Sequence, residues 1–584
     1  MISYHRLRTL LFLTALLITG VLTAASRMLD VYGVNPPPPP WQPVLEEYPE
    51  SAIGQRPTAL PSPTPIPVPT PLPDPTGWKP AAPGVDYQEY VLPQPNRVYV
   101  ARMDRAQNNL ILDTALANNI VGEGRQTVSG MAAREQDALS LWGQVSPLTD
   151  TLGMRSQVVV AVNGSFFDMF SGVPTSGVIE SGSYGKKFTD RTNGSGFVWT
   201  NTREPFIGAC VVHRPGKQFI QHVESGEIFP FQAINTSRSE DQITLYTPQN
   251  GTTTPPHEDD PTRTVDTEIV VQLLAPFGLT ENNEAVIGIV QDVRRRQRPA
   301  AILHDQLVIA AEGERGDELR ATLREGDRLE IYQSITNYDA ACATPTPQDW
   351  GRAYASLGGS FVFLQDGEVP VFDDLGALYW HPRTAIAYND AYIYFIVVDG
   401  RSSASRGMSM YELGAFAQEE LDAVWGIAQD GGGSSAMVIN GRVVNQPSDF
   451  ACHTVYLPLI TVGDGRRATV SQTSLPDEAE TCTGGERPVA NAWMMLALQP
   501  PVWSDAFTVG DAISLQATTP LYQGPGTNYP IVFWGDADST GTVAGDGFAL
   551  NGVRAKGQHW WFVDVGYAAG WVTESALDGP YPAP

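Results

Sequence analysis

Cysteine is scarce in this chain of 584 residues, which has four of them. They lie far apart, and no two have the C-x-x-C spacing that cysteine zinc sites use. A cysteine-based zinc site is therefore not expected. In an exported protein the cysteines can form one or two disulfides, and the sequence does not choose among the three full pairings. The cysteines are Cys210, Cys342, Cys452 and Cys482.

Positive charge is also scarce. The chain has 37 lysines and arginines against 64 aspartates and glutamates, which gives a formal net charge of −27. Nucleic-acid binding needs clustered basic residues, and the long-range field of this chain repels phosphate backbones. The one basic run, Arg294–Arg298, is interpreted as a solvated turn. The composition therefore argues against a nucleic-acid partner.

Several common catalytic signatures are missing. The sequence has no Walker A motif and no H-E-x-x-H motif, and neither Ser434 nor Ser435 lies in a G-x-S-x-G nucleophile elbow. These absences disfavour a P-loop nucleotidase, a zincin protease and an α/β-hydrolase. Without histidine clusters a catalytic transition metal is disfavoured as well, whereas Ca²⁺ or Mg²⁺ held by oxygen ligands stays open.

The chain begins with a basic segment followed by an apolar stretch. His5, Arg6 and Arg8 precede LLFLTALLITGVLTAAS. An apolar run of about 16 residues is long for a signal peptide and short for a spanning helix. We expect export through a signal peptide or signal anchor in residues 1–27, and cleavage near Ala25 stays open. The basic flank and the prolines that follow disfavour a core helix.

The length predicts several domains. Residues 28–83 include PSPTPIPVPTPLPDP, and proline at this density predicts an extended linker without a core. The main domain is predicted at 84–465, with an elaboration around 200–345 where polar turns are frequent. A second linker is predicted at 466–506, and a small domain rich in glycine and tryptophan at 507–578.

Two apolar runs lead directly into polar residues. Gln157–Val162 is followed by Asn163, and Tyr392–Val398 is followed by Asp399. Continuous β-branched runs of this length are typical of strands that are buried on both faces. Asn163 and Asp399 are therefore predicted to stand at strand ends.

A helix and a short third strand are predicted after Asp399. Apolar residues recur at helical spacing from Leu413 onward, and Ser409 with Glu412 forms a capping box at the start. The strand Gly426–Gln429 then ends at Asp430.

The order strand, helix, strand predicts a right-handed parallel crossover. Asp399 and Asp430 would then share one edge of the sheet, where α/β proteins bind ligands, and Asn163 joins them if its strand is parallel too. The sequence thus predicts an α/β (mixed α+β) catalytic domain with a largely parallel or mixed sheet, followed by a small all-β SH3-like barrel.

The segment DGGGSSAMVINGRVV, residues 430–444, places three glycines and two serines beside Asp430. Asn440–Gly441 suits a type I′ turn between two strands. The glycines permit positive φ, and successive N–H groups in such a loop can bind an anion. Taken singly, each feature also has a plain structural interpretation: a glycine turn, a loop-capping Asp399, a structural His381 and a surface Arg383.

Six ordered segments together resemble the phosphodiester glycosidase family, over roughly residues 84–465 and most strongly from Arg383 to Asp449. They are VNGSFFD, NTSRSEDQITLYTP, HPRTAIAY, YIYFIVVDGRSS, MSMYELGAFAQEEL and DGGGSSAMVINGRVVNQPSD. This family includes a lysosomal enzyme that removes N-acetylglucosamine from phosphodiester-capped mannose. The resemblance implies a hydrolase that cleaves a sugar-1-phosphodiester at the anomeric carbon. With the expected export, it is predicted to act outside the cell on cell-wall or exopolysaccharide glycans. No cofactor is predicted, and Ca²⁺ or Mg²⁺ stays open.

The resemblance also implies roles for residues. Asp430 and Asp399 are the expected catalytic carboxylates, one of them acting as a base toward water or as a nucleophile. A phosphate leaving group needs neutralisation more than protonation, so Arg383 and Arg401 are expected to clamp it, helped by N–H groups of the glycine loop. The expected substrate-binding residues are Asn163, Ser165, Arg383, Arg401, Gly431, Gly432, Gly433, Ser434, Ser435, Asn445 and Asp449.

The tail of the chain is similar to bacterial SH3-like domains in LYQGPGTNYPIVFWGD and in the later GWVTESAL. Such domains are small barrels that often bind peptidoglycan, so contact with peptidoglycan is implied here. Trp560, Trp561 and Trp571 form either a stacking surface or a core. Membrane contact is expected only through the N-terminal segment.

Two further functions stay open on sequence grounds. One is a non-catalytic protein that binds cell-wall glycans. The other is a metal-dependent phosphodiesterase that uses the aspartates to hold Ca²⁺ or Mg²⁺.

Overall fold

The computed structural model describes ten stretches of the chain, all within one compact unit that begins at Val68. They are residues 77–122, 124–142, 153–188, 196–208, 211–236, 241–256, 267–274, 285–337, 350–449 and 485–581. The predicted signal segment 1–27, most of the proline-rich linker and all four cysteines lie outside them. Among the described residues, no helix is long and apolar enough to cross a membrane.

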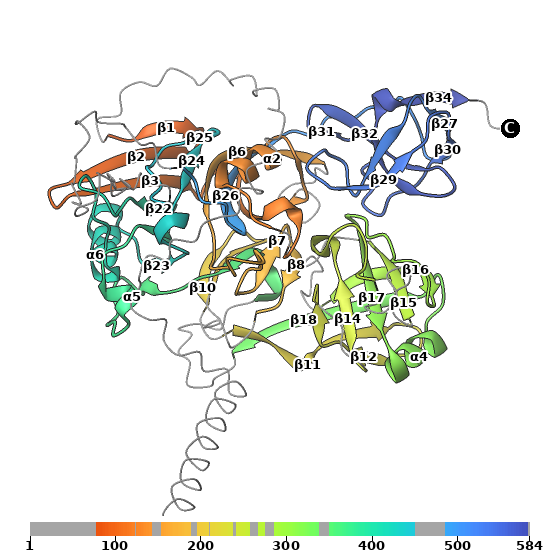
Figure 1. Ribbon diagram of the computed structural model, residues 1–584, viewed down its shortest axis with the longest axis horizontal. Helices are drawn as coiled ribbons and strands as arrows, with labels where there is room; N and C mark the ends of the chain where they lie inside the picture. Colours follow the sequence, from red (N-terminus) through yellow and green to blue (C-terminus); the bar gives the residue numbers. More distant parts are fainter. Residues whose placement is uncertain are drawn as a thin grey trace, which may run out of the picture. The chain divides into compact units, whose positions relative to one another are not determined.

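The predicted α/β class is wrong, because strands dominate and they pair antiparallel (Figure 1). Within the ten described stretches, the only parallel pair joins β13 (Ala233–Ile234) to β14 (Ile243–Tyr246). The described α-helices are few and short. They are α2 (Val128–Glu135), α4 (Gly313–Thr322), α5 (Leu375–Leu378) and α6 (Met410–Leu421).

The first sheet carries the strands that end at Asp399 and Asp430. In spatial order it contains β1 (Lys79–Ala82), β2 (Val85–Leu92), β3 (Asn96–Asp104), β22 (Tyr392–Val398), β21 (Arg383–Tyr388), β23 (Trp425–Ala428) and β20 (Val362–Leu364). The predicted crossover would have made β22 and β23 neighbours, but β21 lies between them and is antiparallel to both. Two antiparallel steps restore the direction, so β22 and β23 still run the same way.

Strand β22 shows why its sequence is continuously apolar. Ile393, Phe395 and Val397 face the core shared with the second and third sheets, whereas Ile396 and Val398 face a second core under α6. The continuous apolar run therefore indicates that both faces of the strand are buried. An antiparallel sheet covered by a helix buries both faces just as a parallel sheet does. Helix α6 begins with the predicted capping box, in which Ser409 and Glu412 bond each other's backbone N–H groups.

The second sheet supplies Asn163 at the end of β6. Its order is β25 (Arg442–Val443), β24 (Met437–Ile439), β6 (Met154–Asn163), β26 (Asn491–Gln499) and β4 (Leu110–Leu116), and β5 (Leu139–Ser140) pairs with β6. The predicted type I′ turn joins β24 to β25, with φ of 47° at Asn440 and 77° at Gly441. Strand β26 falls in the stretch 466–506 that sequence assigned to a linker, yet it is buried between β6 and β4.

The third sheet packs on the same core. Its order is β10 (Pro205–Gly208), β9 (Gly196–Thr200), β19 (Ala353–Gly358), β7 (Val178–Glu180) and β8 (Ser183–Lys186). Phe197 and Trp199 from β9 and Leu357 from β19 join this core. The first three sheets are thus built around one continuous apolar interior.

An inserted sheet and a C-terminal sheet complete the described chain. The inserted sheet has the order β12 (Ile228–Pro230), β11 (Val211–His222), β18 (Arg328–Asn337), β16 (Ala285–Arg294), β15 (Thr267–Leu273), β17 (Gln306–Ala311), β14 and β13. The C-terminal sheet has the order β29 (Ile531–Gly535), β28 (Thr519–Tyr522), β33 (Ala569–Thr573), β32 (Gln558–Asp564), β30 (Thr540–Val543), β27 (Ala512–Leu515) and β34 (Leu577–Tyr581), and β31 (Arg554–Ala555) pairs with β32. In this C-terminal unit Trp560, Trp561 and Trp571 are buried core residues.

Candidate active site

Asp399 and Asp430 stand at the ends of two strands that run in the same direction. Asp399 follows β22, and its backbone N–H donates to Arg97 O at 3.1 Å. Asp430 comes two residues after β23, and its backbone N–H donates to Gly164 O at 2.9 Å. The second bond crosses from the first sheet to the end of β6, so the two sheets meet at this point.

Asn163 is the link between the two sheets. Its side chain is fully buried, and Nδ2 donates to Asp430 O at 2.7 Å. Its Oδ1 accepts from Thr384 Oγ1 at 2.6 Å and from Ala436 N at 3.2 Å. With donor and acceptor atoms both engaged, Asn163 positions the backbone around Asp430 and does not present its amide to a ligand.

The glycine loop is held by internal bonds, which corrects the predicted open row of N–H groups. Gly432 N donates to Pro382 O at 2.9 Å, and Ser434 N donates to Gly431 O at 3.3 Å. The Gly431 N–H bonds the Asp430 carboxylate. Three of the four N–H groups expected to bind phosphate are therefore already used inside the protein.

Close packing explains the glycines instead. A Cβ at Gly431 would lie 2.7 Å from Pro382 O, and one at Gly433 would lie 2.4 Å from Asp449 Oδ1. Gly432 has φ of +64°, a conformation that disfavours side chains. These positions let the loop lie against Pro382 and against the pair formed by Asp449 and Arg487.

Asp399 is buried, with 4% of its surface exposed, and its carboxylate is surrounded by donors. Asn445 Nδ2 donates to Oδ1 at 3.0 Å, and Gln446 N donates to the same atom at 3.1 Å. Burial raises the pKa of Asp399 to about 6, against the lowering effect of these hydrogen bonds. Asn445 also bonds Ser435 O and Met437 N, so Asp399 anchors the chain that returns from the β24–β25 hairpin.

Asp430 is only partly buried and lies among positive charges. Burial raises its pKa to about 6, while the Ser434 hydroxyl bond and the charges of Arg487 and Arg401 act in the opposite direction. A carboxylate with a pKa near neutrality, beside two guanidinium groups, is the kind of perturbed group that marks functional sites. Of the two aspartates, Asp430 is the less buried.

Arg487 was missed by the sequence analysis. Its Nη2 pairs with Asp449 Oδ1, and its Nη1 lies 3.4 Å from Ser434 Oγ. Burial lowers the pKa of Arg401, and the nearby positive charge of Arg487 lowers it further. Arg487 belongs to the stretch predicted to be a linker, and no local sequence pattern identified it as a site residue. The apolar run of β26, which begins four residues later, was the sequence feature that could have indicated a folded segment here.

Arg383 is placed differently from the prediction. Its Nε donates to Met408 O at 2.8 Å, and its Nη2 donates to Gly376 O at 2.7 Å and Tyr379 O at 2.8 Å. The guanidinium group is buried among carbonyl groups, and burial lowers its pKa to about 10. Arg383 therefore fixes the α5 segment and is not a phosphate clamp in this arrangement.

The predicted serines are buried near the same point. Ser165 N donates to Asn491 Oδ1 at 2.7 Å, and Asn491 Nδ2 donates to Ser165 Oγ at 3.1 Å. Ser434 and Ser435 are both buried, at 0% and 1% exposed. The Ser434 hydroxyl group contacts the charged cluster through its hydrogen bonds with Asp430 and Arg487. His381 is half-buried, and burial lowers its pKa.

Part of the chain matches a known protein family. Residues 282–458 match the sequence model of the phosphodiester glycosidase family. The matched segment contains Asp399, Arg401, Asp430 and the glycine loop, and it excludes Asn163 and Arg487. No curated protein matches the sequence of the chain.

Solved structures with distant similarity include three at low sequence identity. A hypothetical protein from Synechocystis is 16% identical, with a TM-score of 0.43 over 71% of this chain and 62% of that one, so the chain spans less than two thirds of that protein. A Burkholderia pseudomallei protein described as a candidate exported protein is 17% identical, with a TM-score of 0.39 over 68% of this chain and 74% of that one. The catalytic domain of zebrafish N-acetylglucosamine-1-phosphodiester alpha-N-acetylglucosaminidase, auto-inhibited by its pro-peptide, is 11% identical, with a TM-score of 0.30 over 70% of this chain and 81% of that one.

Proposed function

We propose that this protein is a glycoside hydrolase that cleaves a sugar-1-phosphodiester at the anomeric carbon. One observation carries the proposal: Asp430, a partly exposed carboxylate inside the segment that matches the phosphodiester glycosidase family, lies beside Arg401 and Arg487. A carboxylate can act on the anomeric carbon of the sugar, and two guanidinium groups can bind the phosphate. An ordinary glycosidase needs two carboxylates and has no use for the cations.

The proposed reaction needs one negative and two positive groups, which matches the charges of Asp430, Arg401 and Arg487. The bond between the anomeric carbon and the phosphate oxygen breaks, water adds its oxygen to the carbon, and a phosphate monoester leaves. The leaving group carries negative charge that guanidinium groups stabilise through charge-assisted hydrogen bonds. The electron-poor sugar centre is served by an ionised carboxylate, either as nucleophile or as base toward water.

The geometry supports different tasks for the two aspartates. Asp430 is assigned to the anomeric carbon because it is the less buried of the two and lies near both arginines. Asp399 is assigned as a positioning residue, because its carboxylate is occupied by Asn445 and Gln446. Arg401 and Arg487 are assigned to the phosphate, and Asp449 holds Arg487 in place.

The proposal extends to location and substrate source. The apolar segment in residues 1–27 supports export, and the proline-rich stretch after it supports a position away from the membrane. The acidic charge of −27 is consistent with a glycan substrate and with no nucleic-acid partner. The proposal treats the C-terminal unit as an SH3-like domain that contacts peptidoglycan, and the natural substrate is then a phosphodiester of wall or exopolysaccharide glycans.

Sugar release measured across pH tests the function. Incubation with methyl N-acetylglucosamine-1-phosphodiester is expected to release free N-acetylglucosamine and methyl phosphate. Because the pKa of Asp430 is raised to about 6, and the reaction needs the ionised form, kcat/KM is expected to rise as the pH increases through about 6. A rate that falls over this range would assign Asp430 as a proton donor, and no release from any sugar-1-phosphodiester would favour a glycan-binding protein.

A further inference from the structure

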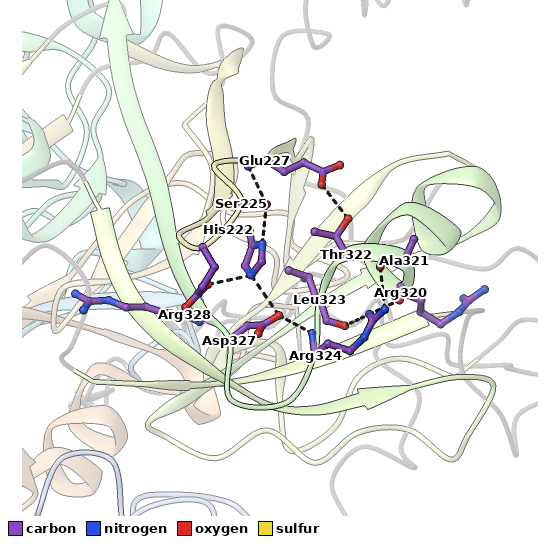
Figure 2. A network of polar contacts seen from close by, with 11 residues as sticks. His222, Ser225, Glu227, Arg320, Ala321, Thr322, Leu323, Arg324, Asp327 and Arg328 are labelled. Atoms are coloured by element: carbon purple, nitrogen blue, oxygen red, sulfur yellow. Dashed lines mark hydrogen bonds and ion pairs between the residues drawn. The ribbon is translucent and has the colours of Figure 1, made fainter.

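A histidine and two carboxylates meet at one edge of the inserted sheet, on elements that contribute nothing to the candidate active site. His222 is the last residue of β11, Glu224 lies in the turn before β12, and Asp327 immediately precedes β18. Strands β11 and β18 pair with His222 opposite Leu329, which brings the two turns together. Figure 2 shows the His222 ring with Ser225 on one side and the Asp327 carboxylate on the other.

The spacing of the three groups suits a bound cation. His222 Nε2 lies 2.9 Å from Glu224 Oε2 and 3.2 Å from Asp327 Oδ2, and the three atoms lie within 4.8 Å of one another. Ligand atoms around a tetrahedral zinc ion, with bonds of about 2.0–2.2 Å, are separated by roughly 3.3–3.6 Å. To admit the ion, the two His222 distances would lengthen by a few tenths of an ångström, and the two carboxylate oxygens, now within 4.8 Å of each other, would take up the same spacing.

The histidine is prepared for the role of ligand. Its side chain is 8% exposed, and among the described residues the polar neighbours of Nε2 are the carboxylates of Glu224 and Asp327. On the other side of the ring, Nδ1 lies 2.7 Å from Ser225 Oγ, which also accepts from Glu227 N. When Nδ1–H donates to Ser225, the lone pair of Nε2 points at the two carboxylates, as it does in histidines that bind metals.

In the described part of the chain, His222 is the side chain that forms ion pairs with the two carboxylates. Among the described residues, neither Glu224 nor Asp327 forms an ion pair with a lysine or arginine. The nearby Arg324 directs its guanidinium group to the carbonyl oxygens of Arg320, Ala321 and Leu323 at the end of α4. The backbone N–H groups of Arg324 and Arg328 orient the carboxylates, as outer-shell donors do around metals.

We propose that His222, Glu224 and Asp327 bind a divalent transition-metal ion of the zinc type. One nitrogen and two carboxylate oxygens form three ligands, and the Glu224 side, with 53% of its side chain exposed, leaves the fourth position to water. The ion cross-links the β11–β12 turn and the α4–β18 turn, which are about one hundred residues apart in sequence. It stabilises the inserted sheet and takes no part in the glycosidase reaction.

Metal titration of the full chain, after chelator treatment, tests this site. Zn²⁺ is expected to bind with micromolar or tighter affinity and to raise the melting temperature by several degrees, whereas Ca²⁺ and Mg²⁺ are not. Co²⁺ is expected to give visible d–d absorption without the charge-transfer band of cysteine ligands. Glu224→Gln and Asp327→Asn are expected to weaken the binding of Zn²⁺ at least about tenfold.

Glu227→Gln is the matched control, because Glu227 lies in the same turn and bonds Thr322 without facing His222. It should bind Zn²⁺ like the unchanged protein. The proposal is overturned if Glu224→Gln binds Zn²⁺ as tightly as the unchanged protein. It is also overturned if no metal changes the melting temperature while acid raises it through the range of histidine protonation, since a proton would then bridge the two carboxylates.

Discussion

Asp430→Asn is expected to lower kcat for a sugar-1-phosphodiester by roughly 10³-fold or more. Asn has nearly the same shape but cannot act as a nucleophile or base. The bonds that place the loop, from Asn163 Nδ2 to Asp430 O and from Asp430 N to Gly164 O, involve the backbone and are retained. The loss should therefore appear in kcat measured by release of sugar, with little change in melting temperature.

The control for this substitution is Asp422→Asn. Asp422 is exposed, caps α6 and has φ of 49°, which asparagine adopts readily. It makes the same chemical change on the connection that leads to β23 and should leave kcat unchanged. Turnover by folded Asp430→Asn within a few-fold of the unchanged protein would show that Asp430 is not the catalytic carboxylate.

Arg487→Ala is expected to lower kcat/KM for a sugar-1-phosphodiester by about 10²–10³-fold, the usual loss when one preorganised donor to a developing anion is removed. The effect should depend on the leaving group. An aryl glycoside contains no phosphate for Arg487 to bind, so the rate of its slow hydrolysis should change little in Arg487→Ala. The ratio of the two kcat/KM values therefore isolates the contribution of phosphate binding from any general damage.

Two further variants separate charge from structure at Arg487. Asp449→Asn removes the ion-pair partner but retains the guanidinium group, and a smaller loss is expected. Arg442→Ala removes an exposed arginine from the nearby β25 and should have no effect. Equal losses for both substrate types in Arg487→Ala would contradict the assignment of Arg487 to the phosphate.

The sequence predicted the elements around the site better than their arrangement. The run Tyr392–Val398 and the capping box at Ser409 predicted β22 and α6 because apolar periodicity and capping are local signals. The partner of β22 is not a local property. Burial on both faces suggested a parallel sheet, whereas here one face packs on the second sheet and the other under α6.

The details of the site escaped the sequence for a related reason. The glycine-rich composition of residues 431–433 permits both an anion-binding loop and a tightly packed turn, and only the position of Pro382 O decides between them. Arg383 and Arg401 were equivalent in sequence, but the carbonyl groups near α5 occupy Arg383. Arg487 reaches Asp449 from a segment whose composition resembles a linker, a long-range contact that no spacing rule records.

The central claim is that the bond between the sugar carbon and oxygen breaks, and hydrolysis in ¹⁸O-labelled water tests it most directly. Mass spectrometry of both products from a sugar-1-phosphodiester shows which one takes oxygen from the solvent. The arrangement of Asp430 beside Arg401 and Arg487 predicts ¹⁸O in the released sugar and none in the phosphate monoester. Appearance of ¹⁸O in the phosphate would mean attack at phosphorus and would contradict the account.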